Sequence, residues 1–204
     1  MTDGAALPLV MAVTGASGAP YAVRLLEALV AARQPVQLIV SSHGLRLLRT
    51  ETEIGSVADL RARVGASAWD EHVTVFDDDD RGAAPASGSA LSAGMVICPC
   101  SMGTLSAISV GASRSLVERA ADVALKERRT LLLVPRESPY STIHLENMLR
   151  LTRAGAIVLP ASPGFYHRPK ELGELVDFVV ARVLDHLGVT HSIGRRWGDS
   201  PEDR

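Results

Sequence analysis

The sequence has few of the residues that build disulfide or metal sites. Only two of its 204 residues are cysteine, Cys98 and Cys100, and one residue separates them. Two cysteines so close along a strand end do not bridge easily, and they lack the Cys-x-x-Cys spacing of a redox or zinc motif. No His or Cys pair shows metal-ligand spacing either, so we expect no metal. This usage of cysteine fits a reducing compartment.

Long apolar runs and an excess of one charge are also missing. No apolar run approaches the roughly 20 residues that span a bilayer, and the opening MTDGAALPLVMAV lacks the pattern of a signal peptide. The formal net charge of −2 gives no global field for nucleic acid or a membrane surface. We therefore expect a cytoplasmic protein without nucleic-acid or membrane partners. Because 47% of residues are apolar, we expect one domain over residues 1–204, with a polar tail from about residue 190.

The dinucleotide fingerprint Gly-x-Gly-x-x-Gly is absent, although the chain opens like a nucleotide-binding fold. An apolar run, Leu9 to Thr14, ends in the turn Gly15-Ala16-Ser17-Gly18-Ala19, and apolar residues then recur at helical spacing. A strand, a Gly-rich turn and a helix form the first unit of a doubly wound sheet. Such a turn either binds a mononucleotide or only makes a tight connection, and both possibilities stay open.

Apolar runs and amphipathic segments alternate along the remaining chain, which predicts an α/β fold with a mostly parallel sheet. The further expected strands are 36–40, 73–76, 95–98, 131–134 and 156–159. The further expected helices are 45–52, 57–64, 102–111, 115–128, 141–153 and a last helix through 172–187. We expect a mobile loop at 83–92, and the wide apolar face of the last helix predicts a subunit contact.

The stretch MVICPCSMGT, from Met95 to Thr104, carries the strongest signal for a site. It predicts a buried strand to Cys98, a turn at Pro99-Cys100-Ser101 and then a helix of small residues. The first N–H groups of a helix have no partner within it, and the helix dipole favours an anion there. Ser101 and Thr104 add hydroxyl donors to the same turn. We interpret this turn as the binding site for the phosphate of flavin mononucleotide (FMN).

Charged residues elsewhere predict further contacts to anions. Arg119 and Lys126 lie seven residues apart on a predicted helix and share one face, which is either an anion site or a plain solvent face. Arg136 and Glu137 follow a strand between prolines that fix their loop. An acid beside fixed cations stays ionised and can accept a proton. Ser41 ends another strand, where a serine either contacts a ligand or caps the next helix.

Several strings of this sequence closely resemble the UbiX-like flavin prenyltransferases. They are GASGA, CPCSMGTLSAI, ERAADVALKERRTLLLVPRE, IHLENML and PGFYHRP, within a resemblance from about Val10 to Trp197. The resemblance implies a three-layer Rossmann/flavodoxin-like fold that assembles as a homododecamer. It also implies metal-independent transfer of a dimethylallyl group from dimethylallyl phosphate to N5 and C6 of reduced FMN. The product, prenylated FMN, would serve a UbiD-type decarboxylase.

The resemblance further implies roles for individual residues. The residues that would bind FMN are Gly15, Ala16, Ser17, Ser41, Ser101, Met102, Gly103, Thr104 and Arg119. The residues that would bind the prenyl phosphate, partly across subunit boundaries, are Lys126, Arg136, Tyr166 and Arg182. Glu137 would be the acid/base residue beside flavin N5 and Trp197 would lie near the prenyl group, while Lys126 and Ser17 complete the catalytic set. The chain departs from some members at Arg81, where they carry a tryptophan that lines the prenyl pocket.

Two other functions stay open. Related FMN proteins decarboxylate cysteine-containing peptides and need an early catalytic histidine, for which His43 is the only candidate and is poorly placed. Members of the resembling family were also labelled aromatic-acid decarboxylases, an activity that we assign to the partner. A non-catalytic FMN carrier would need no second phosphate site. Whether the diphosphate donor is accepted, and which decarboxylase and pathway use the product, stay open as well.

Overall fold

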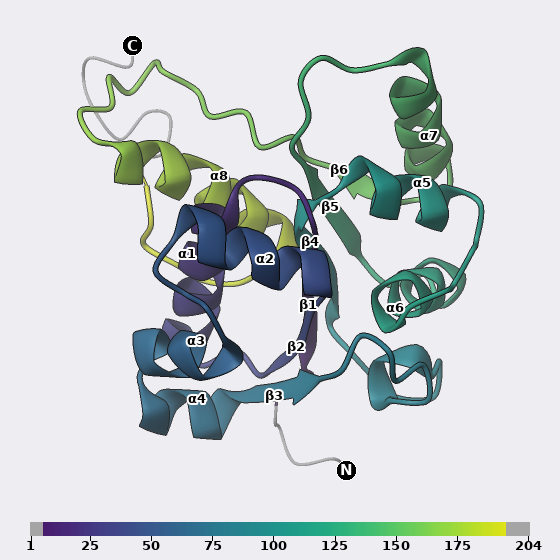
Figure 1. The fold of residues 1–204 in the computed structure, drawn as a ribbon, viewed down its shortest axis with the longest axis horizontal. Coiled ribbons are helices and arrows are strands. Elements are labelled where there is room, and N and C mark those ends of the chain that lie inside the picture. Colours follow the sequence, from purple (N-terminus) through teal and green to yellow (C-terminus); the bar gives the residue numbers. More distant parts are fainter. Residues whose placement is uncertain (1–5, 195–204) are drawn as a thin grey trace.

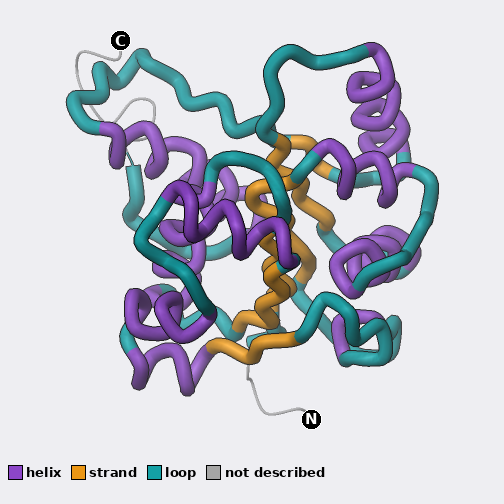
Figure 2. The backbone as a smooth tube through the Cα atoms, in the orientation of Figure 1, coloured by secondary structure: helices purple, strands orange, loops and turns teal. Residues whose placement is uncertain are grey.

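The computed structural model describes residues 6–194, which form a six-stranded sheet between two layers of helices (Figures 1 and 2). The strands are β1 (Leu9–Val13), β2 (Val36–Val40), β3 (Val73–Phe76), β4 (Gly94–Cys100), β5 (Leu131–Pro135) and β6 (Ile157–Val158). The α-helices are α1 (Ala19–Ala31), α2 (Ser42–Glu51), α3 (Val57–Val64), α4 (Ala66–His72), α5 (Met102–Ser109), α6 (Leu116–Lys126), α7 (Thr142–Arg153) and α8 (Leu172–Leu187). All paired strands are parallel, which confirms the predicted three-layer α/β fold.

Side chains along the central strands alternate between two hydrophobic cores. On β1, Leu9 and Met11 pack in the core with α1 and α8, whereas Val10 and Ala12 pack in the core with α5 and α6. Figure 1 shows the same division, with α1, α3, α4 and α8 on one side of the sheet and α5, α6 and α7 on the other. Because both faces of the sheet are covered, its strands are continuously apolar rather than alternating with polar residues.

The strand order, β3-β2-β1-β4-β5-β6, reverses direction between β1 and β4. At such a reversal the loops leave the sheet on opposite sides, and the carboxyl ends of the two strands border a crevice where ligands bind. Thr14 joins these two ends. Its buried hydroxyl donates to the Pro99 carbonyl at 3.0 Å and accepts the Ser101 N–H at 2.9 Å. The loops after β1 and β4 are therefore fixed relative to each other.

Replacing Thr14 by Val is expected to lower the free energy of unfolding by about 1–3 kcal/mol, because the partly buried Ser101 N–H loses its acceptor. Urea unfolding followed by circular dichroism measures this difference. Thr14→Ser keeps the hydroxyl and should lose distinctly less stability. Equal losses in the two variants would show that the methyl group, and not the hydrogen bond, stabilises this junction.

Three sequence predictions are corrected by the structure. The strand of the strongest site signal runs on through Pro99 and Cys100, because a register irregularity after Ile97 lets β4 pair again with Pro135. The segment 83–92, predicted as a loop, contains a short 3-10 helix, η1 (Ala84–Ala86), with a buried proline and alanine. Helix α4 was not predicted at all, and a buried Trp69 holds it against the core.

The two cysteines are free, as their spacing predicts, and both are buried. Burial raises the pKa of the Cys98 thiol to about 12, and it raises the pKa of Cys100 as well, so neither is a thiolate at neutral pH. In the described range, 6–194, no cluster of three or more His, Cys, Asp or Glu side chains is arranged to hold a metal ion. Within the same range, every helix is too short or too polar to cross a bilayer.

Candidate functional site

The loop after β4 enters α5 at Ser101, beside the crevice between β1 and β4. The Ser101 hydroxyl accepts the Thr104 N–H at 3.1 Å and donates to the Thr104 hydroxyl at 3.0 Å. The N–H groups of Met102 and Gly103, the first two of the helix, have no acceptor inside it. This helix end can therefore receive an anion such as a phosphate, as the sequence predicts.

The start of α1, the neighbouring helix end, already holds an acidic side chain. A single carboxylate oxygen of Glu51, at the end of α2, accepts the N–H groups of Gly18 at 2.7 Å and Ala19 at 2.8 Å. Burial acts to raise the pKa of this carboxyl, but hydrogen bonds from Ser17 and from these two N–H groups, with the charge of Arg136, lower it overall. Glu51 is thus ionised and occupies the α1 terminus, which leaves the α5 terminus for a bound phosphate.

No local motif marks Glu51 as a site residue, because its contacts join positions 32 and 33 residues apart. Replacing Glu51 by Gln is expected to lower the free energy of unfolding at pH 7 by about 1 kcal/mol, after allowance for solvent screening. The folded-state pKa is depressed, so this stabilisation is present above the unfolded pKa of about 4.3 and is lost as the pH falls through the lower folded value. Urea unfolding at pH 7 and pH 3 measures it. An equal difference at both pH values would contradict the charge-based account.

Arg136 connects the loop after β5 with the loop after β1. Its Nε donates to the Ser17 carbonyl at 3.0 Å, so the structure brings these two predicted site residues together. Glu137 follows at the same edge, and its carboxylate accepts the Ser138 N–H at 3.1 Å. The proline-bracketed loop therefore sets a cation beside the turn after β1, with an acid next to it in the chain.

Ser41 and His43 lie at the carboxyl end of β2. The Ser41 hydroxyl accepts the Gly44 N–H at 3.1 Å, so it caps α2. Because the hydroxyl acts there as an acceptor, its own O–H can still donate a hydrogen bond to a ligand. His43 lies in the first turn of α2 against Gly15, where an added Cβ on the glycine would be 2.6 Å from the His43 Cβ. Gly15 is therefore needed for the close approach of the turn to α2.

Lys126 lies away from this edge within one chain. Helix α6 begins beside Asp78, whose carbonyl and carboxylate accept its first N–H groups at 2.7 and 2.9 Å. Asp78 follows the carboxyl end of β3, and α6 ends just before β5 begins, so Lys126 lies at the opposite, amino edge of the sheet. Arg119 pairs with Asp122 at 2.7 Å and Lys126 with Glu127 at 2.5 Å.

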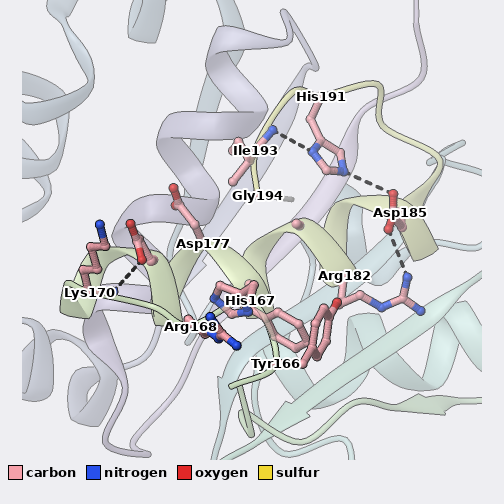
Figure 3. Close-up of a pocket in the computed structure, with 13 residues that line it drawn as sticks. Tyr166, His167, Arg168, Lys170, Asp177, Arg182, Asp185, His191, Ile193 and Gly194 are labelled. Carbon is pink, nitrogen blue, oxygen red and sulfur yellow. Dashed lines mark hydrogen bonds and ion pairs between the residues drawn. The ribbon is translucent and has the colours of Figure 1, made fainter. Parts of the chain in front are cut away.

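Tyr166 and Arg182 border a cavity of about 500 Å³ beside α8 (Figure 3). Tyr166 comes from the loop after β6 and Arg182 from α8 itself, so the structure brings these two predicted phosphate ligands to one cavity. His167, beside them, stacks on Phe178, and its buried Nδ1 has no hydrogen-bond partner within residues 6–194. A buried polar atom of this kind marks a place for a polar ligand or water. Trp197, the remaining predicted residue, lies outside the described residues.

Comparison with known proteins agrees with this arrangement. The family model described as Flavoprotein matches residues 2–184. The flavin prenyltransferase UbiX of Pseudomonas aeruginosa is 50% identical over 198 residues, which cover 94% of either chain. The crystal structure of AnUbiX (PadA1) in complex with FMN and dimethylallyl pyrophosphate is 37% identical with a TM-score of 0.88, over 96% of this chain and 100% of that one.

A second solved structure is the dodecameric FMN-dependent UbiX-like decarboxylase from Escherichia coli O157:H7. It is 42% identical with a TM-score of 0.83, over 91% of this chain and 97% of that one. Sequence identity at this level over nearly the whole length, together with the same fold, establishes the family. The chain belongs to the UbiX flavin prenyltransferases, within the flavoprotein family.

Proposed function

We propose that this chain joins the dimethylallyl group of dimethylallyl phosphate to N5 and C6 of reduced FMN and releases prenylated FMN. The proposal is supported by two separate groups of residues that suit a phosphate. One is the α5 terminus at the carboxyl edge, and the other is the cavity that holds Tyr166 and Arg182. An FMN carrier needs only the first site, whereas a prenyl phosphate donor needs the second.

The residues at the carboxyl edge fit FMN. The N–H groups of Met102 and Gly103 are available for its phosphate, and Gly15 lets the turn after β1 pack against His43 of α2 without a collision. Reduced FMN supplies the electron-rich N5 and C6 positions. The remaining predicted FMN ligands are Ala16, Ser17, Ser41, Ser101, Thr104 and Arg119.

The protein side chains handle the leaving phosphate and the protons. When the allylic C–O bond breaks, its electron pair leaves with the phosphate, and Arg136, Arg182 and Lys126 stabilise the developing anion. Carbon–nitrogen bond formation releases the N5 proton. Ring closure then adds a proton to the prenyl double bond and releases one from C6, so the second step involves no net loss of protons. Glu137, at the sheet edge beside Arg136, accepts the N5 proton.

The active site is completed by a neighbouring copy of the chain. Lys126 lies at the amino edge of its own sheet, so it reaches the donor phosphate of another subunit rather than its own. Helix α7 supports such an assembly, because Ile143, Leu145 and Leu149 are exposed on it. The E. coli relative is dodecameric, and a homododecamer of this chain with shared sites accounts for both features. The product then passes to a UbiD-type decarboxylase.

The experiment that tests this function uses the purified protein, reduced FMN and dimethylallyl phosphate without oxygen. Mass spectrometry of the released flavin should show the addition of one C5H8 unit, and omission of the donor should leave FMN unchanged. Tight binding of unchanged FMN in the complete mixture would identify a carrier. Decarboxylation of a cysteine-ending peptide without prenylation would instead identify the cysteine-oxidising class.

Replacing Gly15 by Ala is expected to raise the dissociation constant of FMN about tenfold or more, because the new methyl group collides with the His43 Cβ. The φ angle of Gly15 lies outside the left-handed region, so the penalty is steric. Quenching of flavin fluorescence measures binding. The double variant Gly15→Ala/His43→Gly removes the opposing Cβ and should recover much of the affinity, with His43→Gly alone as the control. No recovery would place the effect elsewhere.

A further inference from the structure

Asp185 contacts two side chains that line the cavity beside α8, Arg182 and His191. One carboxylate oxygen accepts from Arg182 Nη1 at 3.1 Å, and the other lies 3.2 Å from His191 Nε2. Figure 3 shows this continuous chain of contacts from the C-terminal segment, through Asp185, to Arg182. Arg182 is the cation that the proposed function assigns to the donor phosphate.

His191 is fixed in one orientation and one tautomer. Its Nδ1 accepts the backbone N–H of Ile193 at 3.1 Å, so we assign the ring proton to Nε2, which donates to Asp185. The His191 side chain is only 5% exposed. A buried ring that is held by the backbone therefore fixes the carboxylate of Asp185 from the side opposite Arg182.

The segment that carries His191 folds back onto α8. Ile193 packs at the edge of the core, and a Cβ added to Gly194 would lie 3.4 Å from the Ala181 Cβ. Ile193 and Gly194 also line the cavity. Residues 190–194 thus form one wall of the space that Tyr166 and Arg182 border.

An ion pair three residues apart on an exposed helix would by itself contribute little. The Arg182 side chain is 52% exposed, so an ion pair with Asp185 alone would not restrict it to one conformation. The buried His191 changes this, because a carboxylate held on both oxygens presents one fixed acceptor to the guanidinium. Ordering a long side chain before the ligand arrives lowers the entropic cost of binding.

We propose that Asp185 and His191 are positioning residues that hold Arg182 toward the phosphate of the prenyl donor. Docking of residues 190–194 onto α8 then assembles this cation, so the C-terminal segment sets the affinity for the donor. The inference deepens the proposed function and rests on it, since it takes Arg182 as a ligand of the donor phosphate. Neither Asp185 nor His191 contacts the reacting atoms in this arrangement.

The test compares the Michaelis constants for the two substrates. In Asp185→Ala and His191→Leu, the KM for dimethylallyl phosphate is expected to rise roughly tenfold, while the KM for reduced FMN stays unchanged. His191→Gln keeps an N–H donor near the Nε2 position and should restore most of the wild-type KM. His186→Leu, an exposed histidine on the same helix, is the matched control and should behave as wild type.

Other outcomes would overturn the inference. A KM for the donor that stays at the wild-type value in folded Asp185→Ala and His191→Leu shows that Arg182 needs no positioning. Equal increases in both KM values, or a failure of His191→Gln to rescue, show a merely structural role. Asp185→Asn, which preserves the side-chain shape, replaces any variant that does not fold.

Failure of the proposed function is distinguishable from failure of this inference. If the wild type forms no prenylated flavin, the proposed function is wrong. The positioning role of Asp185 is then tested by measuring the binding of dimethylallyl phosphate by calorimetry. The wild type should bind it roughly tenfold more tightly than Asp185→Ala. Equal affinities of the two proteins would reject the positioning role whether or not prenyl transfer occurs.

Discussion

Replacing Glu137 by Gln is expected to slow prenylation about a thousandfold while FMN remains bound, since a positioned acid/base contributes factors of this size. Gln keeps the size of Glu137 and an oxygen that accepts the Ser138 N–H, so the loop after β5 retains its shape. It cannot take a proton from flavin N5. Single-turnover reactions without oxygen, followed by mass spectrometry of the flavin, measure the rate, and flavin fluorescence measures binding.

The control is Glu71→Gln, on helix α4, which leads into the amino end of β3 and is exposed. This variant should match the wild type in both rate and FMN affinity. Glu137→Gln could instead weaken FMN binding while the flavin that remains bound is prenylated at the normal rate. That result would contradict the acid/base role of Glu137. Glu137 would then be a flavin ligand, and the proton acceptor would have to be sought among the other groups of the edge, beginning with Glu51.

The fold is predictable because the apolar pattern reports burial directly. The strand 36–40 was predicted with its observed bounds, since a parallel strand covered on both faces is continuously apolar. Helix α4 was missed because only Trp69 on it is buried, which leaves no apolar stripe to detect. The end of β4 was missed because Pro99 indicates a turn locally, whereas pairing with β5 keeps it in the sheet.

Some residues of the candidate site were also predictable from the sequence, and others were not. Local patterns predicted Ser41 from its place at a strand end and Ser101 from its place at the start of a helix. Glu51 and His191 were not predicted, because their roles depend on contacts that no local pattern encodes. The resemblance assigned Lys126 to the donor phosphate, but only the structure shows it at the far edge of its own sheet.

Mixing two inactive variants, Lys126→Ala and Arg136→Ala, is expected to restore activity. Each variant alone should lose about a hundredfold in rate, because each removes one cation, roughly 3 kcal/mol, from the developing phosphate anion. If Lys126 and Arg136 at one site come from different copies, random assembly gives an intact site in about a quarter of cases. Co-expression with two affinity tags, sequential purification and the prenylation assay measure the recovered rate per site.

The matched control mixes wild-type chains with chains that carry both substitutions. Shared sites leave about a quarter of this mixture active as well, whereas sites built within one chain leave about half of it active and the first mixture inactive. Unmixed oligomers would give the same pattern as sites built within one chain, so the comparison uses only oligomers that are retained by both affinity tags. Thermal melting must show that both variants are folded. An inactive first mixture beside a half-active control would place Lys126 and Arg136 in the same site of the same chain. Because α6 carries Lys126 to the amino edge of its sheet and Arg136 follows the carboxyl end of β5, we expect the shared result.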